Sequence, residues 1–132
     1  MEEVNVIVAS KMFKFFPLLL YKMKERKINL NITDCSNTDE VASIFDPLET
    51  DLVIVDITWA DIYMSASVLI KKLKDKKPAL KMIGVTKNCN KNIIPRLKIL
   101  GIQGYFSWDT ESLTPILECI EKVVAGEKHY CQ

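Results

Sequence analysis

Short apolar runs alternate along the chain with longer segments in which apolar residues recur every three or four positions. A short continuous apolar run predicts a strand buried on both faces, whereas helical spacing predicts an amphipathic helix. The expected strands cover residues 4–9, 30–35, 51–56, 80–86 and 102–106. The expected helices cover residues 12–27, 39–45, 66–73, 90–100 and 113–124. Because each strand is followed by a helix, this order predicts a parallel sheet covered by helices on both faces.

Residues with known preferences at helix termini define the ends of these elements. Pro17 is tolerated in a helix only near its first turn. Thr38 is expected to cap the second helix, and Pro47 to stop it. Gly101 is expected to close the fourth helix, and Thr110 to cap the last one.

Composition and charge limit the classes of function. The length of 132 residues suits one domain, 1–132, with a substantial core. Eighteen basic and seventeen acidic side chains give a formal charge of +1, so no global field draws the domain to nucleic acid or to an anionic membrane. No apolar run approaches the ~18 residues of a membrane span, and no leader pattern opens the chain. We therefore expect a soluble, cytoplasmic protein without direct nucleic acid or membrane contacts.

Two lysine-rich segments, residues 22–27 and 71–77, invite a nucleic-acid interpretation. Each ends an expected helix, where cations are favoured by the helix dipole, and neither is interleaved with aromatic residues. Both segments are therefore expected to be solvated helix faces.

The four cysteines are Cys35, Cys89, Cys119 and Cys131. They show neither C-x-x-C spacing nor a nearby set of histidines, so neither a zinc site nor a thioredoxin-like motif is indicated. We expect reduced thiols that mostly serve packing. His129 stands alone near the C-terminus and is not expected to bind a metal or to catalyse a reaction.

The third expected strand runs from four apolar residues straight into Asp56. In a doubly wound five-stranded sheet of order 2-1-3-4-5, the carboxyl ends of strands one, three and four meet beside a crevice where ligands bind. That crevice would collect the residues that end or directly follow the strands, namely Ala9, Ser10, Asp56, Thr86, Ser107 and Trp108.

Three short motifs give the chain a family resemblance. They are V-I-V-D at 53–56, I-G-V-T at 83–86 and G-I-Q-G-Y at 101–105, in this order. Along essentially its whole length the chain resembles the receiver domain of bacterial two-component response regulators. Residues 123–130 are similar to the tail of receivers that precede a helix-turn-helix effector.

The resemblance implies a flavodoxin-like α/β fold with five parallel strands and five helices. It also implies that Asp56 stands at the phosphoacceptor position, and that Thr86 and Tyr105 stand at the switch positions.

The chain departs from the family at the charged positions that support phosphorylation. Receivers carry an acidic pair after the first strand, and the matching residues here are Ala9 and Ser10. The family's lysine after the fifth strand is replaced by Trp108, whose indole cannot act as an ammonium. With Asp56 as the one carboxylate, the site is expected to bind Mg²⁺ poorly. No metal and no other cofactor is therefore expected.

Two lysines lie next to these strand ends, Lys11 and Lys87. Our hypothesis is that one of them pairs with Asp56 and supplies the positive charge that a metal would have given. The alternative is that both lysines are solvated, since exposed ion pairs contribute only ~0–1 kcal/mol.

Each remaining candidate also has a purely structural interpretation. Asp56 could cap its loop, and Thr86 could satisfy local backbone groups. For Tyr105 we favour a packing role, half-buried and with its hydroxyl at the surface. Trp59 and Trp108 flank the crevice, either as apolar lids or as anchors for a protein partner.

The preferred function is a regulatory interaction module, an atypical receiver with a degenerate metal site and no enzymatic activity. It would dock through its fourth helix, fifth strand and fifth helix, as a homodimer and with protein partners that include a sensor histidine kinase or a phosphotransfer protein. The alternative is a conventional receiver that accepts phosphate on Asp56. A flavin or cobalamin enzyme fits least, because residues 10–13 lack a phosphate-binding cradle and the chain lacks the cobalamin histidine motif.

Overall fold

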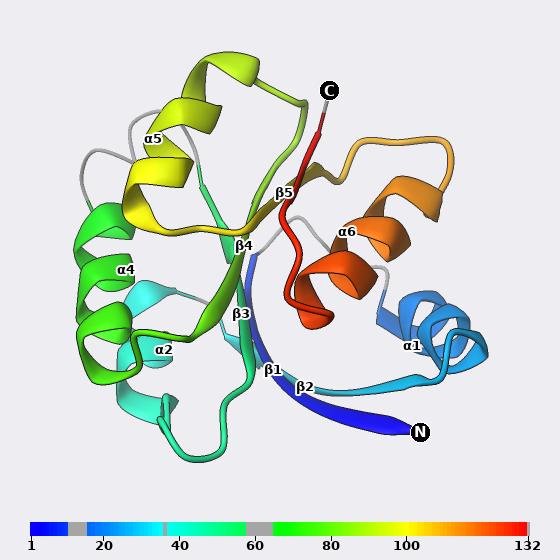
Figure 1. Cartoon of the computed structure of the whole chain (residues 1–132), viewed down its shortest axis with the longest axis horizontal. Coiled ribbons are helices and arrows are strands. Elements are labelled where there is room, and N and C mark those ends of the chain that lie inside the picture. Colours follow the sequence, from blue (N-terminus) through cyan, green and yellow to red (C-terminus); the bar gives the residue numbers. More distant parts are fainter. Residues whose placement is uncertain (11–15, 36, 58–64, 132) are drawn as a thin grey trace.

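The chain forms a six-stranded parallel sheet with helices on both faces, in the strand order β2-β1-β3-β4-β5-β6 (Figure 1). The computed structural model describes residues 1–10, 16–35, 37–57 and 65–131. The strands are β1 (Glu2–Ala9), β2 (Ile28–Cys35), β3 (Leu52–Asp56), β4 (Lys81–Thr86), β5 (Gly104–Ser107) and β6 (His129–Tyr130). The helices are α1 (Phe16–Glu25), α2 (Thr38–Ile44), α4 (Ser65–Lys76), the 3-10 helix η1 (Lys91–Ile93), α5 (Ile94–Leu100) and α6 (Thr114–Val124). The expected α/β class and the order 2-1-3-4-5 are confirmed.

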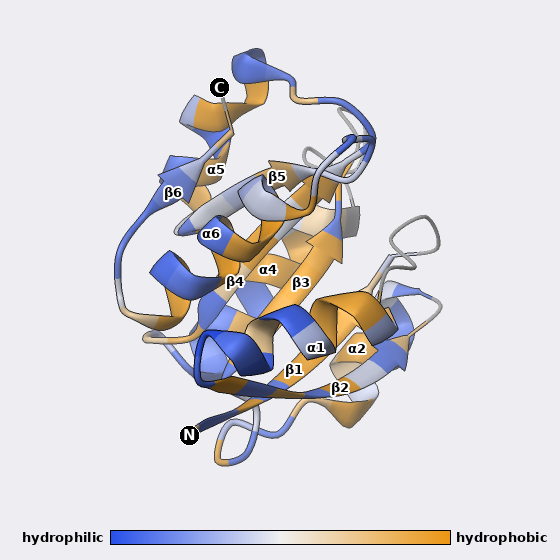
Figure 2. Ribbon diagram, turned by 90° about the vertical axis from the view of Figure 1, so that its right-hand side faces the viewer, coloured by the Kyte–Doolittle hydropathy of each residue, from blue (hydrophilic) through white to orange (hydrophobic). Residues whose placement is uncertain are grey.

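Strand β3 lies in the middle of the sheet and is buried from both sides. Val53 and Val55 pack on the side of α2, α4 and α5. Leu52 and Ile54 pack on the side of α1 and α6. The two helical layers flank the sheet in Figure 1, and the central strands are almost uniformly apolar in Figure 2. The continuous apolar run of β3 is therefore explained by burial of the strand on both faces.

The helix ends differ from some of the expected caps. Asn37, and not Thr38, caps α2, because the Asn37 side chain accepts the Glu40 N–H at 2.9 Å. Helix α6 begins at Thr114 without a side-chain cap, so the expected cap at Thr110 is wrong. Gly101 closes α5 as expected, in the left-handed conformation with φ +82°.

The first helix is described from Phe16 onward, and Pro17 is the second residue of this described part. Residues 12–15 of the expected helix lie outside the described residues. Among the helices that are described, none has the length and the apolar character needed to cross a membrane.

The expectation of five strands is wrong by one short strand. Strand β6 runs parallel to β5, with the His129 N–H donating to the Gln103 carbonyl at 2.9 Å and the Cys131 N–H to the Tyr105 carbonyl at 2.8 Å. A turn at Gly126, with φ +91°, leads the chain from α6 back to the sheet edge. A two-residue strand leaves no periodic pattern, and His129 belongs to it rather than to a free tail.

The second lysine-rich segment, residues 71–77, is only partly solvated. Lys71 and Lys72 are exposed as expected. The Lys77 ammonium, however, donates to the Thr50 carbonyl at 2.6 Å, and the Lys74 ammonium donates to the Leu80 carbonyl. Burial lowers the pKa of Lys74. These two lysines therefore join α4 to neighbouring loops.

Gly104 allows β5 and α6 to approach closely. A Cβ at this position would lie 2.7 Å from Val123 Cγ2 and 2.9 Å from Cys119 Sγ. We expect Gly104→Ala to lower the free energy of unfolding by about 1–3 kcal/mol through overpacking, measured by urea denaturation. Gly126→Ala is the matched control, because nothing lies within 4 Å of an added Cβ there and only backbone strain should appear. A loss below about 0.5 kcal/mol in Gly104→Ala would contradict the close approach.

Candidate functional site

The carboxyl ends of the strands come together at one edge of the sheet, as the sequence predicted. The register aligns Ala9 with Val55, Asp56 with Val85, and Thr86 with Ser107. The Ile57 N–H continues this alignment by donating to the Val85 carbonyl at 2.8 Å. The candidate residues at this edge are therefore placed by strand pairing, which makes their relative positions a property of the sheet.

Asp56 contacts the residue that follows β1. The Ser10 hydroxyl donates to Asp56 Oδ2 at 3.0 Å. Ser10 is only 2% exposed, and Asp56 is half-buried at the end of β3. The position that the resemblance assigns to an acidic residue thus holds a buried hydroxyl directly against the carboxylate.

The described residues next to Asp56 supply few of the ligands that Mg²⁺ prefers. The ion prefers octahedral oxygen ligands with one or two carboxylates in addition to substrate oxygens. Ser10 offers a hydroxyl that already donates to Asp56, and Ala9 offers a methyl group that packs in the core. Among the described residues, no group of three His, Cys, Asp or Glu side chains could hold a metal ion.

The two switch positions are joined in one hydrogen-bond chain. Thr86 Oγ1 lies 2.7 Å from the Tyr105 hydroxyl and 2.6 Å from the Asn88 carbonyl. The Asn90 N–H donates to the Tyr105 hydroxyl at 2.8 Å. The consistent proton order has Asn90 donating to Tyr105, Tyr105 to Thr86, and Thr86 to Asn88. The loop after β4 therefore holds both switch hydroxyls.

The expectation of a half-buried Tyr105 with its hydroxyl at the surface is wrong. The side chain is 0% exposed and belongs to the core on the α2, α4 and α5 side. A buried phenol is stable because its hydroxyl finds partners inside, which the chain through Thr86 and Asn90 provides. Sequence pattern alone does not reveal such partners, because they depend on the path of the loop after β4.

The other candidates at this edge are distributed as follows. Trp108 is half-buried, packs against the core on the α1 and α6 side, and donates its backbone N–H to the Thr86 carbonyl at 2.9 Å. This packing favours the lid interpretation. Lys87 is exposed, while Lys11 and Trp59 lie outside the described residues. The pairing of a lysine with Asp56 therefore stays a prediction.

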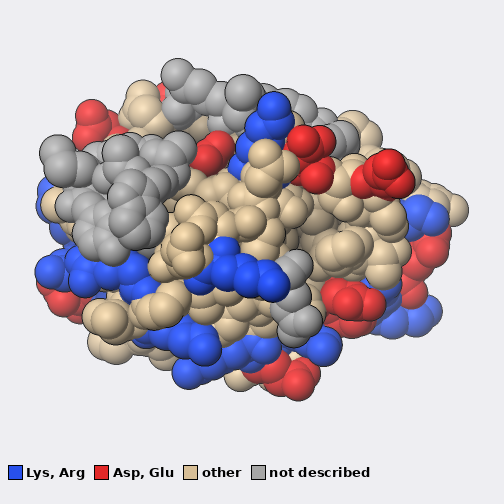
Figure 3. All heavy atoms as spheres, turned by 90° about the horizontal axis from the view of Figure 1, so that it is seen from above, with Lys and Arg blue, Asp and Glu red and all other residues tan. Residues whose placement is uncertain are grey.

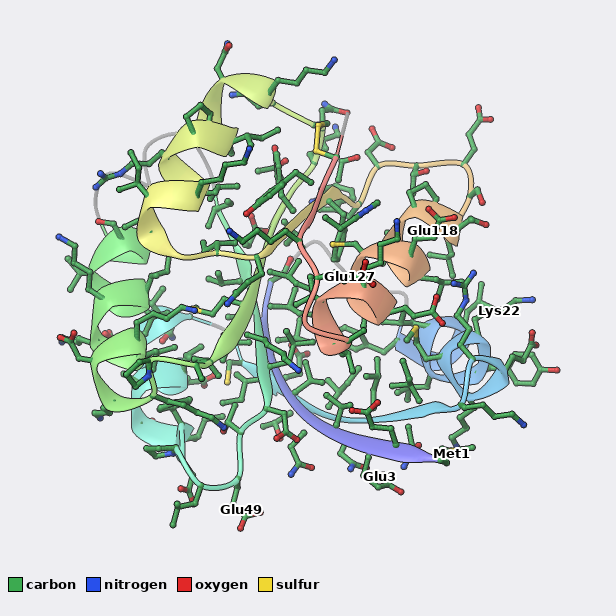
Figure 4. The ribbon with its side chains drawn as sticks, in the orientation of Figure 1. Met1, Glu3, Lys22, Glu49, Glu118 and Glu127 are labelled. Carbon is green, nitrogen blue, oxygen red and sulfur yellow. A yellow bond between two sulfur atoms is a disulfide. The ribbon has the colours of Figure 1, made fainter. Side chains whose placement is uncertain are left out.

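The expectation that all four cysteines are reduced thiols is wrong for two of them. Cys89 and Cys131 form a disulfide, with Cα atoms 6.1 Å apart, which is visible beside the C-terminal end in Figure 4. Cys35 and Cys119 are free and buried as expected. Burial raises the pKa of Cys119 to about 12, and burial together with the charges of nearby acidic residues raises that of Cys35.

No sequence signal marks this disulfide. Cys89 and Cys131 are 42 residues apart, and they meet because β6 returns along β5 beside the loop after β4. The sequence reveals neither the short strand nor the disulfide, because the disulfide can form only when β6 brings Cys131 next to Cys89.

Comparison with solved structures identifies the fold of this chain. The sequence matches no protein-family model and no curated protein. Among solved structures, the isolated receiver domain of RcsB from Salmonella enterica serovar Typhimurium superposes with a TM-score of 0.69 and 21% identity, over 99% of this chain and 95% of that one. This chain has the receiver fold.

Two further structures share the receiver fold. A LuxR family DNA-binding response regulator from Silicibacter pomeroyi gives a TM-score of 0.72 at 10% identity, over 98% of this chain and 97% of that one. HP1043, an orphan response regulator of H. pylori, gives a TM-score of 0.65 at 15% identity, over 92% and 96% of the two chains. At these identities the comparison speaks for the fold, and function has to be argued from the residues.

Proposed function

We propose that this chain is a signal-transduction module, an atypical receiver that acts mainly through protein–protein contacts and not as an enzyme. The observation that carries the proposal is the hydroxyl of Ser10 against Asp56, where a phosphorylatable receiver would be expected to hold a carboxylate. The receiver fold and the match of Asp56, Thr86 and Tyr105 to family positions support a signalling role.

The chemistry of phosphoryl transfer explains why this substitution matters. The transferred group carries charge that metal ions and cationic side chains neutralise in the transition state. Here Ala9 and Ser10 replace the metal-holding pair, and Trp108 replaces the lysine. Two of the three charged parts of the site are therefore missing, which favours signalling without phosphorylation.

The partners in this proposal are proteins, with a sensor histidine kinase or a phosphotransfer protein as candidates. The proposed docking and dimer surface is built from α5, β5 and α6, the structural counterparts of the elements expected from the sequence. Because β6 is paired with the outer edge of β5, contacts on this side would include residues of β6. A cytoplasmic location and a link to transcription regulation belong to the same proposal, supported by the resemblance of residues 123–130 to receivers that precede a helix-turn-helix effector.

A conventional receiver that accepts phosphate on Asp56 is the second candidate. The contact between Thr86 and Tyr105 favours it, since the two switch positions are in place and joined by a 2.7 Å hydrogen bond. A retained switch without phosphorylation would have to be moved by another input, such as a binding partner.

Phosphorylation by acetyl phosphate separates the two candidates. We expect incubation with acetyl phosphate and Mg²⁺ to leave the intact mass of the protein unchanged, because Ala9, Ser10 and Trp108 stand where receivers carry the groups that neutralise the phosphoryl charge. A known phosphorylatable receiver in the same reaction shows that the reagent is active.

Two variants decide which carboxylate is responsible if a mass gain appears. Asp109→Asn removes an exposed carboxylate after the neighbouring strand β5 and serves as the matched control for Asp56→Asn. A stable gain of one phosphoryl group that persists in Asp109→Asn and disappears in Asp56→Asn would overturn the proposal in favour of the conventional receiver.

A further inference from the structure

The disulfide ties the last strand of the sheet to the loop that holds the switch residues. Cys131 directly follows β6, and Cys89 lies between Asn88 and Asn90, whose backbone groups contact Thr86 and Tyr105. Apart from the disulfide, β6 is attached by backbone hydrogen bonds to Gln103 and β5, by the Tyr130 hydroxyl, which donates to the Ile102 carbonyl at 2.7 Å, and by the Cys119 thiol, which donates to the His129 carbonyl at 3.5 Å. Tyr130 and Cys131 also pack against the core, and the disulfide adds a covalent bond to these non-covalent contacts.

Cys131, one half of this disulfide, lines a basic groove. A surface groove of about 580 Å³ lies between α5 and β6, and Cys131 is among its lining residues. Its basic lining consists of three exposed lysines and one histidine, namely Lys91, Lys98, Lys128 and His129. None of the lining residues is acidic.

The groove therefore provides a route for an anionic nucleophile. Nearby cations stabilise thiolates, and the thiolate is the form that attacks a disulfide. The Lys98 ammonium is placed 5.2 Å from the centre of the Tyr130 ring, next to Cys131 in sequence. Figure 3, viewed from above Figure 1, shows Lys and Arg side chains mostly in the lower half of that face.

We propose that the Cys89–Cys131 disulfide is a thiol–disulfide exchange site, reduced by a dithiol that reaches Cys131 through this groove, and that its reduction releases β6. The first thiolate of the dithiol forms a bond to Cys131 Sγ while the bond between Cys131 and Cys89 breaks. The electron pair stays on Cys89, which takes up a proton.

The second thiolate of the dithiol then attacks the dithiol's own sulfur in the mixed disulfide, and Cys131 leaves and takes up a proton. The protein gains two electrons and two protons, and the dithiol is oxidised to its disulfide. Cys35 and Cys119 are buried and take no part in this exchange.

Release of β6 changes two features at once. The outer edge of β5, over Gly104 and Tyr105, loses its paired strand and presents unpaired backbone groups to a partner. The loop at residues 88–90 loses its covalent tether while it still holds the Tyr105 hydroxyl. The redox state of the disulfide is thereby linked to the switch pair.

A reducible disulfide also reconciles the structure with the compartment expected from the sequence. Disulfides are rare in the cytosol, and those that occur there are usually transient and catalytic or redox-sensing. This proposal does not depend on whether Asp56 accepts phosphate, so the two proposals succeed or fail separately.

Hydrogen exchange and thiol labelling test the release of β6. After reduction of the native full chain with dithiothreitol, we expect iodoacetamide to label Cys89 and Cys131 and to spare the buried Cys35. The amide protons of His129 and Cys131 should then exchange at least about tenfold faster than in the oxidised protein. The double variant Cys89→Ser/Cys131→Ser should show the faster exchange without any reductant.

Unchanged amide exchange after complete reduction would overturn the release of β6. A disulfide that resists dithiothreitol under native conditions would overturn the exchange site itself.

A second measurement tests the route of attack. Charge removal in the triple variant Lys91→Gln/Lys98→Gln/Lys128→Gln should slow reduction by dithiothreitol about threefold or more, because the attacking thiolate loses its cationic environment. Lys122→Gln is the control, an exposed lysine on α6 outside the groove, and should react at the wild-type rate. Equal rates in the triple variant and the control would contradict attack through the groove.

Discussion

Tyr105→Ala is expected to lower the free energy of unfolding by about 3–5 kcal/mol. The side chain is completely buried in the core against α2, α4 and α5. Its removal leaves a cavity between the sheet and these helices, and it also leaves the Asn90 N–H without its acceptor. Urea denaturation followed by circular dichroism measures the loss.

A smaller substitution separates the hydroxyl from the ring. We expect Tyr105→Phe to cost about 1–3 kcal/mol, because the ring still fills its site but Asn90 and Thr86 lose their shared partner. Tyr21→Phe is the matched control, since Tyr21 is 62% exposed, and its stability should stay within about 0.5 kcal/mol of wild type. If Tyr105→Phe behaved like the control, the buried hydrogen-bond chain would not be a stabilising feature of the protein.

Loss of the disulfide is the second large effect that we expect. The bond closes a loop across a sequence separation of 42 residues, so its removal restores considerable entropy to the unfolded chain. The chain-entropy relation gives about 4 kcal/mol for a loop of this size, at the upper end of the usual range of about 2–4 kcal/mol.

Cys89→Ser/Cys131→Ser should therefore unfold at a lower urea concentration than the oxidised wild type and should match the reduced wild type. The reductant alone should not move the midpoint of the double variant, which is the internal control. A difference below about 1 kcal/mol between oxidised wild type and double variant would show that the bond is not formed in the folded protein or does not constrain its unfolded state.

The sheet was predictable because most of its strands are buried on both faces. The run from Leu52 to Val55 is apolar without interruption, and the alternation of strands and helices restricts the topology to a few doubly wound arrangements. The topology alone predicted that residues at the carboxyl ends of the strands, Ser10 and Asp56 among them, lie close together. The hydrogen bond of 3.0 Å between the Ser10 hydroxyl and Asp56 agrees with that prediction.

The C-terminal part could not be predicted in the same way. Strand β6 has two residues, and its pairing depends on the turn at Gly126 and on the exposed edge of β5, neither of which produces a periodic pattern. Without β6, nothing in the sequence brings Cys131 next to Cys89. The spacing rules for cysteine motifs then pointed to reduced thiols, because those rules apply to local pairs and not to a pair that a sheet edge assembles.

The details of helix caps and of Tyr105 depended on local backbone geometry. Asn37 and Thr38 are both good cap residues, and only the backbone path shows that Asn37 precedes the first helical residue. Tyr105 follows the family motif, but its burial requires that the loop at residues 88–90 supply hydrogen-bond partners. Patterns of residue type identify these positions without revealing how far each is buried.

Magnesium titration by isothermal calorimetry shows directly whether Asp56, beside the Ser10 hydroxyl, binds a metal ion. We expect wild type and Asp56→Asn to give the same heats, with no binding tighter than about 1 mM. Sub-millimolar binding of Mg²⁺ to wild type that disappears in Asp56→Asn would show that the site still holds the ion and that the receiver is not atypical in this respect.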